Sequence, residues 1–365
     1  MKIAIDIRET TKDKTGKGWY TFVLVKTLLE LDSQNKYLLY THTKNPEFEK
    51  FPNAEQIIIK KRGIRWHLRT LRHLKKTKPD LFWAPTSFII PALAPKSLTT
   101  FITVHDIVAF LFPQGHNRKA VYLERLTLRR ALSKSSRIFT VSRNTKTDLI
   151  KLFNIDETKI IIAPCSASAA FTKINDENLL GKTKKKFDLP EKFILGVGTL
   201  SPRKNFTRLI QAFAQIAPEH PDTHLVIVGN KGWDFDDILK GASRKKVHLI
   251  GYVESFELIS LYNLAQVFVF PSLYEGFGIP PLEAMSCGCP VVTSNISSLP
   301  EVVGDSALLI DPYSTEEIAG AIGTLLSNKD LHADLGRKGL RQATKFSWEK
   351  SAKVLLEVFE SLKTS

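Results

Sequence analysis

Two glutamates at a fixed spacing are the first candidates for chemistry in this sequence. Glu275 and Glu283 lie on either side of GFGIPPL, whose two glycines permit a tight loop and whose Pro-Pro pair favours the start of a helix. The apolar run at 267–270 predicts a buried strand before this loop, and PVV at 290–292 predicts the next strand. This order places both carboxylates at the carboxyl edge of a parallel sheet, where open α/β folds bind ligands. The alternative is a pair of solvated carboxylates at a helix terminus.

Two adjacent cations follow another predicted strand, which covers residues 193–197. Gly198 allows the chain to turn there, and Arg203 and Lys204 stand at the entrance of a helix predicted to begin at Asn205. An Arg and a Lys at a helix entrance suit a diphosphate, because both carry donors and positive charge. The alternative is a pair of solvated cations, which is the usual fate of such residues.

The first half of the chain places further polar groups after predicted strands. Gly16-Lys17-Gly18 precedes a helix predicted over 19–31, and permits either a phosphate contact or a structural turn. The apolar run TTFITVHDI delivers His105 and Asp106 to a strand end. A lone histidine is more often structural than catalytic, and an aspartate here suits the cap of the following turn.

The segment SLYEGFGIPPLEAMSCGCPVV, continued by SSLPEVVGDSALLIDP, resembles the signature of the family 4 retaining glycosyltransferases, also called glycosyl transferases group 1. A lone E-x7-E can arise by chance, whereas forty continuous residues in the family's order are specific. The resemblance is close in the second half of the chain and looser in the first. It implies an α/β fold of the GT-B type, in which two Rossmann-like, doubly wound domains face each other across a cleft.

The resemblance also implies roles for individual residues. Glu275 and His105 would form the catalytic contacts to the donor sugar, Arg203 and Lys204 would hold its diphosphate, and Glu283 its ribose. Further diphosphate contacts are implied for Gly16, Gly18, Gly198, Gly276, Phe277, Gly278 and Ile279, and base or ribose contacts for Gly229, Tyr252 and Val253. Asp106, Ser142, Ser294 and Ser298 are additional candidates, the last two as donors to phosphate oxygens.

Two positions depart from the family's pattern. Pro164-Cys165-Ser166-Ala167 stands where many relatives carry a Gly-Val-Asp turn, which puts any ligand contact of that turn in doubt. Thr199 follows Gly198 where some relatives have an arginine, so it is open which contact with the diphosphate Arg203 makes and which Lys204 makes.

The resemblance implies transfer of a hexose from a nucleotide-diphosphate sugar to a glycan or lipid-linked acceptor, with retention and without a metal or other cofactor. GTLSPRKN and SLYEGFGIPPLEAM look most like bacterial mannosyltransferases of surface polysaccharide or glycolipid synthesis, which favours GDP-mannose and leaves UDP-sugars open. Asp234-Phe235-Asp236 matches the D-x-D of metal-dependent glycosyltransferases of another fold, and we discount it because it stands in a predicted surface loop. The alternatives are a GT-B phosphorylase or epimerase, and an inert nucleotide- or anion-binding subunit.

The chain is long enough for two domains, because single cores seldom exceed about 250 to 300 residues. We expect an N-terminal acceptor-binding domain over 1–172, a linker over 173–191 and a nucleotide-sugar domain over 192–345. By the resemblance, a final helix in 346–365 would cross back to the first domain.

The charge is unevenly distributed between the two halves. The net charge is +15, and residues 1–180 hold 31 Lys and Arg against 16 Asp and Glu, whereas the remainder holds 21 of each. Segment 60–78 is basic, with Leu68, Leu71 and Leu74 on one helical stripe, so it suits either an anionic membrane surface or a surface helix packed on the sheet. We expect no nucleic acid partner, because no binding-module signature accompanies the charge.

The cellular compartment is indicated by two features of the sequence, which are the small and odd number of cysteines and the lack of a long apolar segment. Cys165, Cys287 and Cys289 have no metal-ligand or redox spacing, and we expect them to be small buried residues in a reducing compartment. MKIAIDIRET predicts a first strand rather than a signal peptide. We therefore expect a cytoplasmic protein, with peripheral contact at the inner face of the cell membrane as an option.

Overall fold

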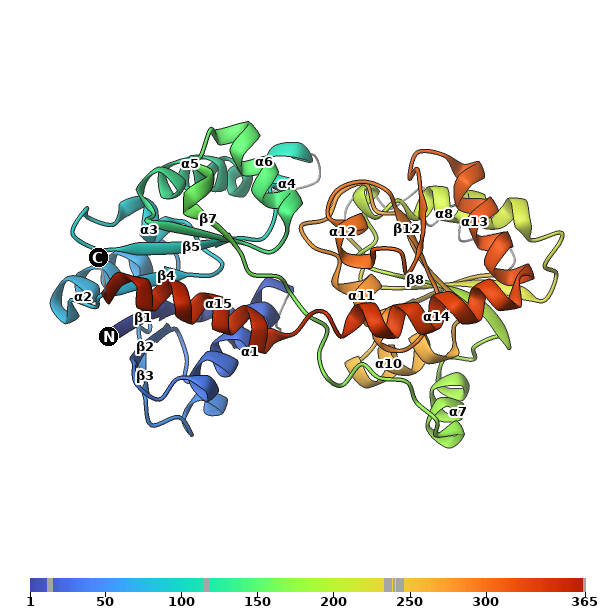
Figure 1. The fold of residues 1–365 in the computed structure, drawn as a ribbon, viewed down its shortest axis with the longest axis horizontal. Coiled ribbons are helices and arrows are strands. Elements are labelled where there is room, and N and C mark those ends of the chain that lie inside the picture. The colour runs from blue at the N-terminus through green and yellow to red at the C-terminus, as the bar shows by residue number, and fades with distance from the viewer. Residues whose placement is uncertain (12–15, 114–117, 233–237, 239, 241–245, 364–365) are drawn as a thin grey trace. The chain divides into compact units, whose positions relative to one another are not determined.

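The computed structural model describes residues 1–11, 16–113, 118–232, 238, 240 and 246–363. The chain forms two compact units, one of residues 1–165 with 347–365 and the other of residues 166–346 (Figure 1). The D-x-D at Asp234–Asp236 lies outside the described residues.

The first unit is built on a seven-stranded parallel sheet with the order β3-β2-β1-β4-β5-β6-β7. The strands are β1 (Lys2–Asp6), β2 (Lys36–Thr41), β3 (Ala54–Ile58), β4 (Leu81–Ala84), β5 (Thr100–Val104), β6 (Arg137–Thr140) and β7 (Ile160–Ile162). The helices are α1 (Gly16–Leu31), α2 (Ile64–Thr77), α3 (Ile89–Leu93), α4 (Val108–Leu111), α5 (Arg118–Lys134), α6 (Arg143–Phe153) and α15 (Trp348–Glu360).

Right-handed crossovers divide these helices between the two faces of the sheet. Helices α1 and α15 pack together on one face, and α3 and α5 pack together on the other (Figure 1). Phe359 of α15 is fully buried, and its ring lies 5.8 to 6.2 Å from those of Trp83, Phe101 and Phe139. The last helix of the chain is therefore part of the core of the first unit.

The second unit holds a six-stranded parallel sheet with the order β10-β9-β8-β11-β12-β13. The strands are β8 (Lys192–Val197), β9 (Thr223–Val228), β10 (Val247–Gly251), β11 (Val267–Phe270), β12 (Val291–Ser294) and β13 (Leu308–Ile310). The helices are α7 (Glu177–Lys186), α8 (Phe206–Ile216), α10 (Ser255–Leu264), α11 (Ile279–Ser286), α12 (Leu299–Val303), α13 (Thr315–Ser327) and α14 (Lys329–Ala343).

Short 3₁₀ turns occur in both units. They are η1 (Arg8–Thr10), η2 (Pro46–Phe48), η3 (Glu157–Lys159), η4 (Pro202–Lys204) and η5 (Ser361–Lys363).

The strand order of the second sheet determines where its ligand site can lie. From the central strand β8 the chain winds outwards to β9 and β10, and then returns to the other side of β8 for β11, β12 and β13. The direction therefore reverses between β8 and β11, and such a switch point is where open α/β sheets bind ligands at the carboxyl ends of their strands. Arg203 follows β8 and Glu275 follows β11, so the two predicted ligand loops flank this point.

Some segments differ from the expectation drawn from sequence. The range 173–191 contains helix α7, whose Lys186 makes an ion pair with Glu257 of α10, so this segment packs within the second unit rather than joining two units as a linker. The polar loop after β1 is shorter than predicted, because α1 begins at Gly16. Strands β2 and β3 were not predicted at all.

The expectation that the cysteines are small buried residues is confirmed. All three cysteines are free and buried. Among the described residues, no helix is both long enough and apolar enough to span a bilayer.

Candidate active site

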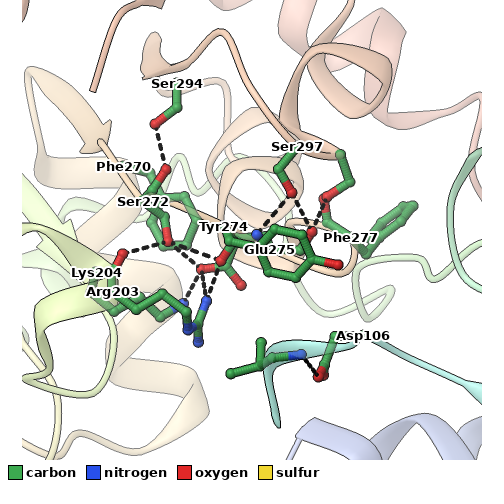
Figure 2. Close-up of polar contacts among 12 residues, drawn as sticks. Asp106, Arg203, Lys204, Phe270, Ser272, Tyr274, Glu275, Phe277, Ser294 and Ser297 are labelled. Carbon is green, nitrogen blue, oxygen red and sulfur yellow. Dashed lines mark hydrogen bonds and ion pairs between the residues drawn. The ribbon is translucent and has the colours of Figure 1, made fainter. Parts of the chain in front are cut away.

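The candidate site of the second unit is centred on Glu275, in the loop between β11 and α11. Arg203 Nη1 lies 2.7 Å and Lys204 Nζ 2.6 Å from Glu275 Oε1, which unites the predicted cation pair with the first predicted glutamate (Figure 2). The side chains of Glu275, Arg203 and Lys204 are 13%, 17% and 11% exposed. Two cations therefore share one carboxylate in a mostly buried place, and the group carries a net positive charge.

The ionisation of this group follows from its partners. Burial alone would raise the pKa of Glu275, but the neighbouring Lys204 and Arg203 charges outweigh burial and hold this pKa below its usual range. Burial lowers the pKa of the Lys204 ammonium, and the Glu275 carboxylate opposes that effect. An added anion such as a diphosphate would meet a positive charge already in place.

The Lys204 side chain lies between Gly198 and the ring of Phe270. Its Nζ lies 4.5 Å from the centre of the Phe270 ring. Gly198 has φ +152°, and a Cβ there would meet the Lys204 side chain at 3.3 Å. Gly229 has φ +150°, and a Cβ there would lie 2.0 Å from the Gly198 carbonyl oxygen, so the loops after β8 and β9 can touch because position 229 is glycine.

Buried serine hydroxyls brace the Glu275 loop. Ser272 Oγ lies 2.6 Å from Glu275 Oε1, and Ser294 Oγ donates to the Ser272 carbonyl oxygen at 2.7 Å (Figure 2). Ser298 Oγ lies 2.6 Å from the Phe277 carbonyl oxygen and 2.9 Å from that of Glu275. We therefore revise the expectation for Ser294 and Ser298, because their hydroxyls are buried and bonded to the main chain rather than open to a phosphate.

Glu283, the second predicted glutamate, lies on α11 and is paired with an aromatic hydroxyl. Tyr262 of α10 donates from its hydroxyl to Glu283 Oε2 at 3.1 Å. Burial raises the pKa of Glu283 to about 7, although the Tyr262 hydrogen bond acts in the opposite direction. Glu283 is thus the group of this site that titrates near neutral pH.

The remaining predicted residues of the second unit lie in the loops after β10 and β11 and at the start of α11. Gly278 has φ +120° and precedes the first residue of α11, Ile279, while the Phe277 ring is buried against Phe346. Tyr252 is 63% exposed and Val253 is buried in the loop after β10. Gly276 lies between Glu275 and Phe277 in the loop itself.

His105 lies at the carboxyl end of β5 in the first unit. Its Nε2 is 2.8 Å from the Pro85 carbonyl oxygen, so Nε2 carries the proton and donates. Burial, together with the nearby Lys17 charge, lowers the pKa of His105 to about 4. The ring is therefore neutral at pH 7, and its Nδ1 is the acceptor.

The other candidates of the first unit have mainly structural contacts. Asp106 accepts from the Val108 N–H at 3.1 Å (Figure 2), which makes it the predicted turn cap. It also lies 3.5 Å from Lys17 Nζ. A Cβ at Gly18 would lie 2.2 Å from the Glu9 carbonyl oxygen, whereas Gly16 has open space. Ser142 is buried and caps α6 by accepting from the Thr145 N–H at 3.0 Å.

Sequence reasoning missed Tyr262, Ser272 and Asn205 as supports of the site. Asn205 takes a left-handed conformation with φ +61°, and its amide donates to the Pro271 and Pro312 carbonyl oxygens at 3.0 and 2.7 Å. Tyr262 lies in a helix with no motif around it. Ser272 stands at the start of the SLYEGFG segment, which was the signal for it, and the signal for Asn205 was that asparagine best tolerates φ > 0 after glycine.

Taken together, the fold and this site define an α/β protein of two parallel-sheet units, with a positively charged cluster at the switch point of the second sheet. A buried glutamate faces two cations at the switch point of a doubly wound sheet. Within the described part of the chain, no three His, Cys, Asp or Glu side chains come together as metal ligands.

The comparisons with known proteins identify the family. Residues 181–342 match the family model for glycosyl transferases group 1, and residues 27–169 match that for glycosyltransferase family 4. The chain is 33% identical to O-antigen chain mannosyltransferase B of Escherichia coli, over 99% of this chain and 100% of that protein. It is 30% identical to O-antigen chain mannosyltransferase RfbU of Salmonella typhimurium, over 87% and 89%. The chain belongs to glycosyltransferase family 4 and is a glycosyltransferase.

Solved structures show the same fold. A sucrose-phosphate synthase of Thermosynechococcus elongatus matches with a TM-score of 0.80 at 19% identity, over 100% of this chain and 99% of that one. Anabaena HepE in complex with UDP and glucose matches with a TM-score of 0.79 at 19% identity, over 99% and 100%. The predicted GT-B fold class is confirmed.

We predict that Glu275→Gln destabilises the free protein by about 3 kcal/mol, because it leaves Arg203 and Lys204 unpaired in a mostly buried place. Added pyrophosphate should restore much of this loss. Thermal unfolding with and without pyrophosphate measures both effects. The control is Glu349→Gln, which removes an exposed helix pair with Lys353 and should cost at most about 0.5 kcal/mol. Equal effects of the two variants would contradict the prediction.

We predict a pH-dependent stability that Glu283→Gln abolishes. The folded-state pKa of Glu283 is raised from 4.5 to about 7. The protonated carboxyl therefore contributes its full stability below the unfolded-state pKa of 4.5, and this stability is lost as pH rises through about 7. At about 1.4 kcal/mol per pKa unit, the wild type should lose on the order of 3 kcal/mol relative to Glu283→Gln between pH 4.5 and 8. Denaturant unfolding of both proteins across this range is the measurement. If the free energies of unfolding of the two proteins changed with pH in parallel, the pKa of Glu283 would not be raised by folding.

Proposed function

We propose that this chain transfers mannose from GDP-mannose to a glycan or lipid-linked acceptor in surface polysaccharide synthesis, with retention of the anomeric configuration. The observation that carries the proposal is the pair of cations held by Glu275 beside the switch point of the second sheet. A departing nucleoside diphosphate needs this kind of charge, and a preorganised cation costs no rearrangement when the bond breaks. The choice of mannose is supported by the names of the full-length relatives.

The proposed reaction divides the work among the named side chains. Arg203 and Lys204 offset the negative charge that develops on the diphosphate as the bond between sugar and phosphate breaks. Glu275 then contacts a hydroxyl of the sugar through its carboxylate. The neutral His105 ring accepts a hydrogen bond from another sugar hydroxyl at Nδ1.

Retention is proposed from the state of the Glu275 carboxylate. This group is ion-paired to two cations and has a lowered pKa, which makes it a poor nucleophile towards the sugar. Transfer on the same face would then proceed with the leaving phosphate helping to deprotonate the acceptor hydroxyl. The acceptor oxygen forms the new glycosidic bond as the bond to the diphosphate breaks.

The first test is thermal unfolding of the wild type with GDP, UDP and ADP, each with and without chelator. A nucleoside diphosphate at 100 times its dissociation constant should add about 2.7 kcal/mol. We expect the shift with GDP and no effect of the chelator, followed by mannose transfer from GDP-mannose to a lipid-linked glycan. An increase in thermal stability with UDP alone would indicate that the donor is a UDP-sugar instead of GDP-mannose. Acceptor-free turnover or dependence on inorganic phosphate would indicate an epimerase or a phosphorylase, and no shift with any nucleotide would indicate an inert subunit.

The first unit offers a surface for a lipid-linked acceptor at an anionic membrane. The predicted leucine stripe of α2 does not face one way, since Leu74 is buried and Leu68 is 45% exposed. Trp66 instead anchors the helix in the core, which turns Ile64 and Leu68 outwards. The exposed cations on the same helix are Arg65, Arg69, Arg72, Lys75 and Lys76.

Helix α5, on the same face of the sheet, also carries exposed apolar side chains next to cations. Tyr122, Leu123 and Leu126 are all exposed, and Arg129 and Arg130 follow them in the next turn of the exposed side. The Arg130 guanidinium donates to the Ala92 carbonyl oxygen at 2.8 Å, which joins α5 to α3. Exposed apolar side chains among cations favour the headgroup region of an anionic bilayer, where apolar groups insert and cations meet phosphates.

We predict that the wild type binds vesicles containing phosphatidylglycerol but not neutral phosphatidylcholine vesicles. Replacing Arg65, Arg69 and Arg72 with serine should weaken binding about 100-fold, at roughly 1 kcal/mol per cation. Co-sedimentation at a fixed salt concentration is the measurement. The matched control replaces three exposed cations outside this face, Lys185, Lys329 and Arg341. Equal losses in the two triple variants would show that binding follows net charge rather than this face.

A further inference from the structure

Ser297 adopts a backbone conformation that few residues with a side chain accept. Its φ is +61°, in the left-handed region where glycine is the least strained choice. It lies between β12 and α12, a segment with no reacting group of its own. A serine at such a position costs free energy, so its hydroxyl must supply something that glycine cannot.

The Ser297 hydroxyl holds the main chain of Glu275 from both sides. Its Oγ accepts from the Glu275 N–H at 3.0 Å and donates to the Glu275 carbonyl oxygen at 2.6 Å (Figure 2). One hydroxyl has a single proton and free lone pairs, so both bonds can form at once. The two residues are 22 positions apart in sequence, and the contact exists only because β11 and β12 are neighbours.

The neighbouring serine adds a second point of attachment. Ser298 precedes α12 but makes no side-chain cap to that helix, and its hydroxyl reaches the Glu275 and Phe277 carbonyl oxygens instead. The carboxylate of Glu275 is held separately, by Ser272 and the two cations. Glu275 is therefore fixed at its main chain and at its side chain by unrelated groups.

We propose that Ser297 is a positioning residue, which fixes the Glu275 main chain so that its carboxylate meets the transferred sugar in a single orientation. This role rests on the proposed function, because it acts through Glu275. The left-handed backbone is what turns the Ser297 hydroxyl towards the loop. A loss of position on the order of 1 Å can lower the rate of an enzyme about 100-fold.

The test is Ser297→Gly, which accepts the left-handed backbone and removes the side chain with its hydroxyl. We expect kcat for mannose transfer to fall about ten- to 100-fold. The dissociation constant for GDP should stay within about twofold, since Arg203 and Lys204 are untouched. Ser297→Ala should show the same loss of kcat with a lower melting temperature, because it keeps the strain and loses the bonds that offset it.

The control is Asn328→Gly, which removes another bond from a side chain to the main chain of the second unit. Asn328 is exposed and caps α14 by accepting from the Leu331 N–H at 3.0 Å, so its loss should leave kcat unchanged. An active wild type with kcat retained in both Ser297 variants would overturn the role of Ser297. A parallel loss of GDP affinity would also overturn it, by showing that the hydroxyl supports the whole loop. A wild type without any transfer would overturn the proposed function itself.

Discussion

The sharing of one carboxylate by two cations is the interaction on which the second unit depends. Arg203, Lys204 and Glu275 come from loops 71 residues apart and meet with little exposure to solvent. Charges in such a place are stable only when paired and hydrogen-bonded, because burial removes their hydration. The pairing therefore ties the loop after β8 to the loop after β11 before any ligand is bound.

Much of the surrounding structure can be understood as support for this group. Glycine at 198 leaves room for the Lys204 side chain, and glycine at 229 lets the loops after β8 and β9 approach closely. Buried serine hydroxyls then satisfy the main chain of a loop that has no regular secondary structure of its own. The arrangement is costly in strain and in buried polar groups, which is what a site that must stabilise developing charge requires.

The first unit has a different physical character. Its sheet is covered by an aromatic core that includes the buried Phe359 of the last helix. Its outer helices, however, carry exposed leucines among cations, whereas the second half of the chain has no net charge.

The sequence by itself determined the alternation of strands and helices over most of the chain, the two-domain class and the residues at the carboxyl ends of β8 and β11. These features follow from local periodicity and from glycine and proline at loop ends, which act over a few residues. It did not reveal β3, an edge strand with a weak apolar pattern, and it also left out β2, which lies between β1 and β3 and carries a buried apolar run. It also suggested a linker where α7 packs, because a basic surface helix shows little periodicity.

Only the tertiary structure decided which side chains meet. Tyr262 on Glu283, Ser297 on the Glu275 main chain and Trp66 as the anchor of α2 each involve contacts between elements that are distant in sequence or that could have faced another way. Sequence spacing places a residue at a strand end or on a helix face. The neighbour that it contacts there depends on strand order and on how the helices pack, which are properties of the whole fold.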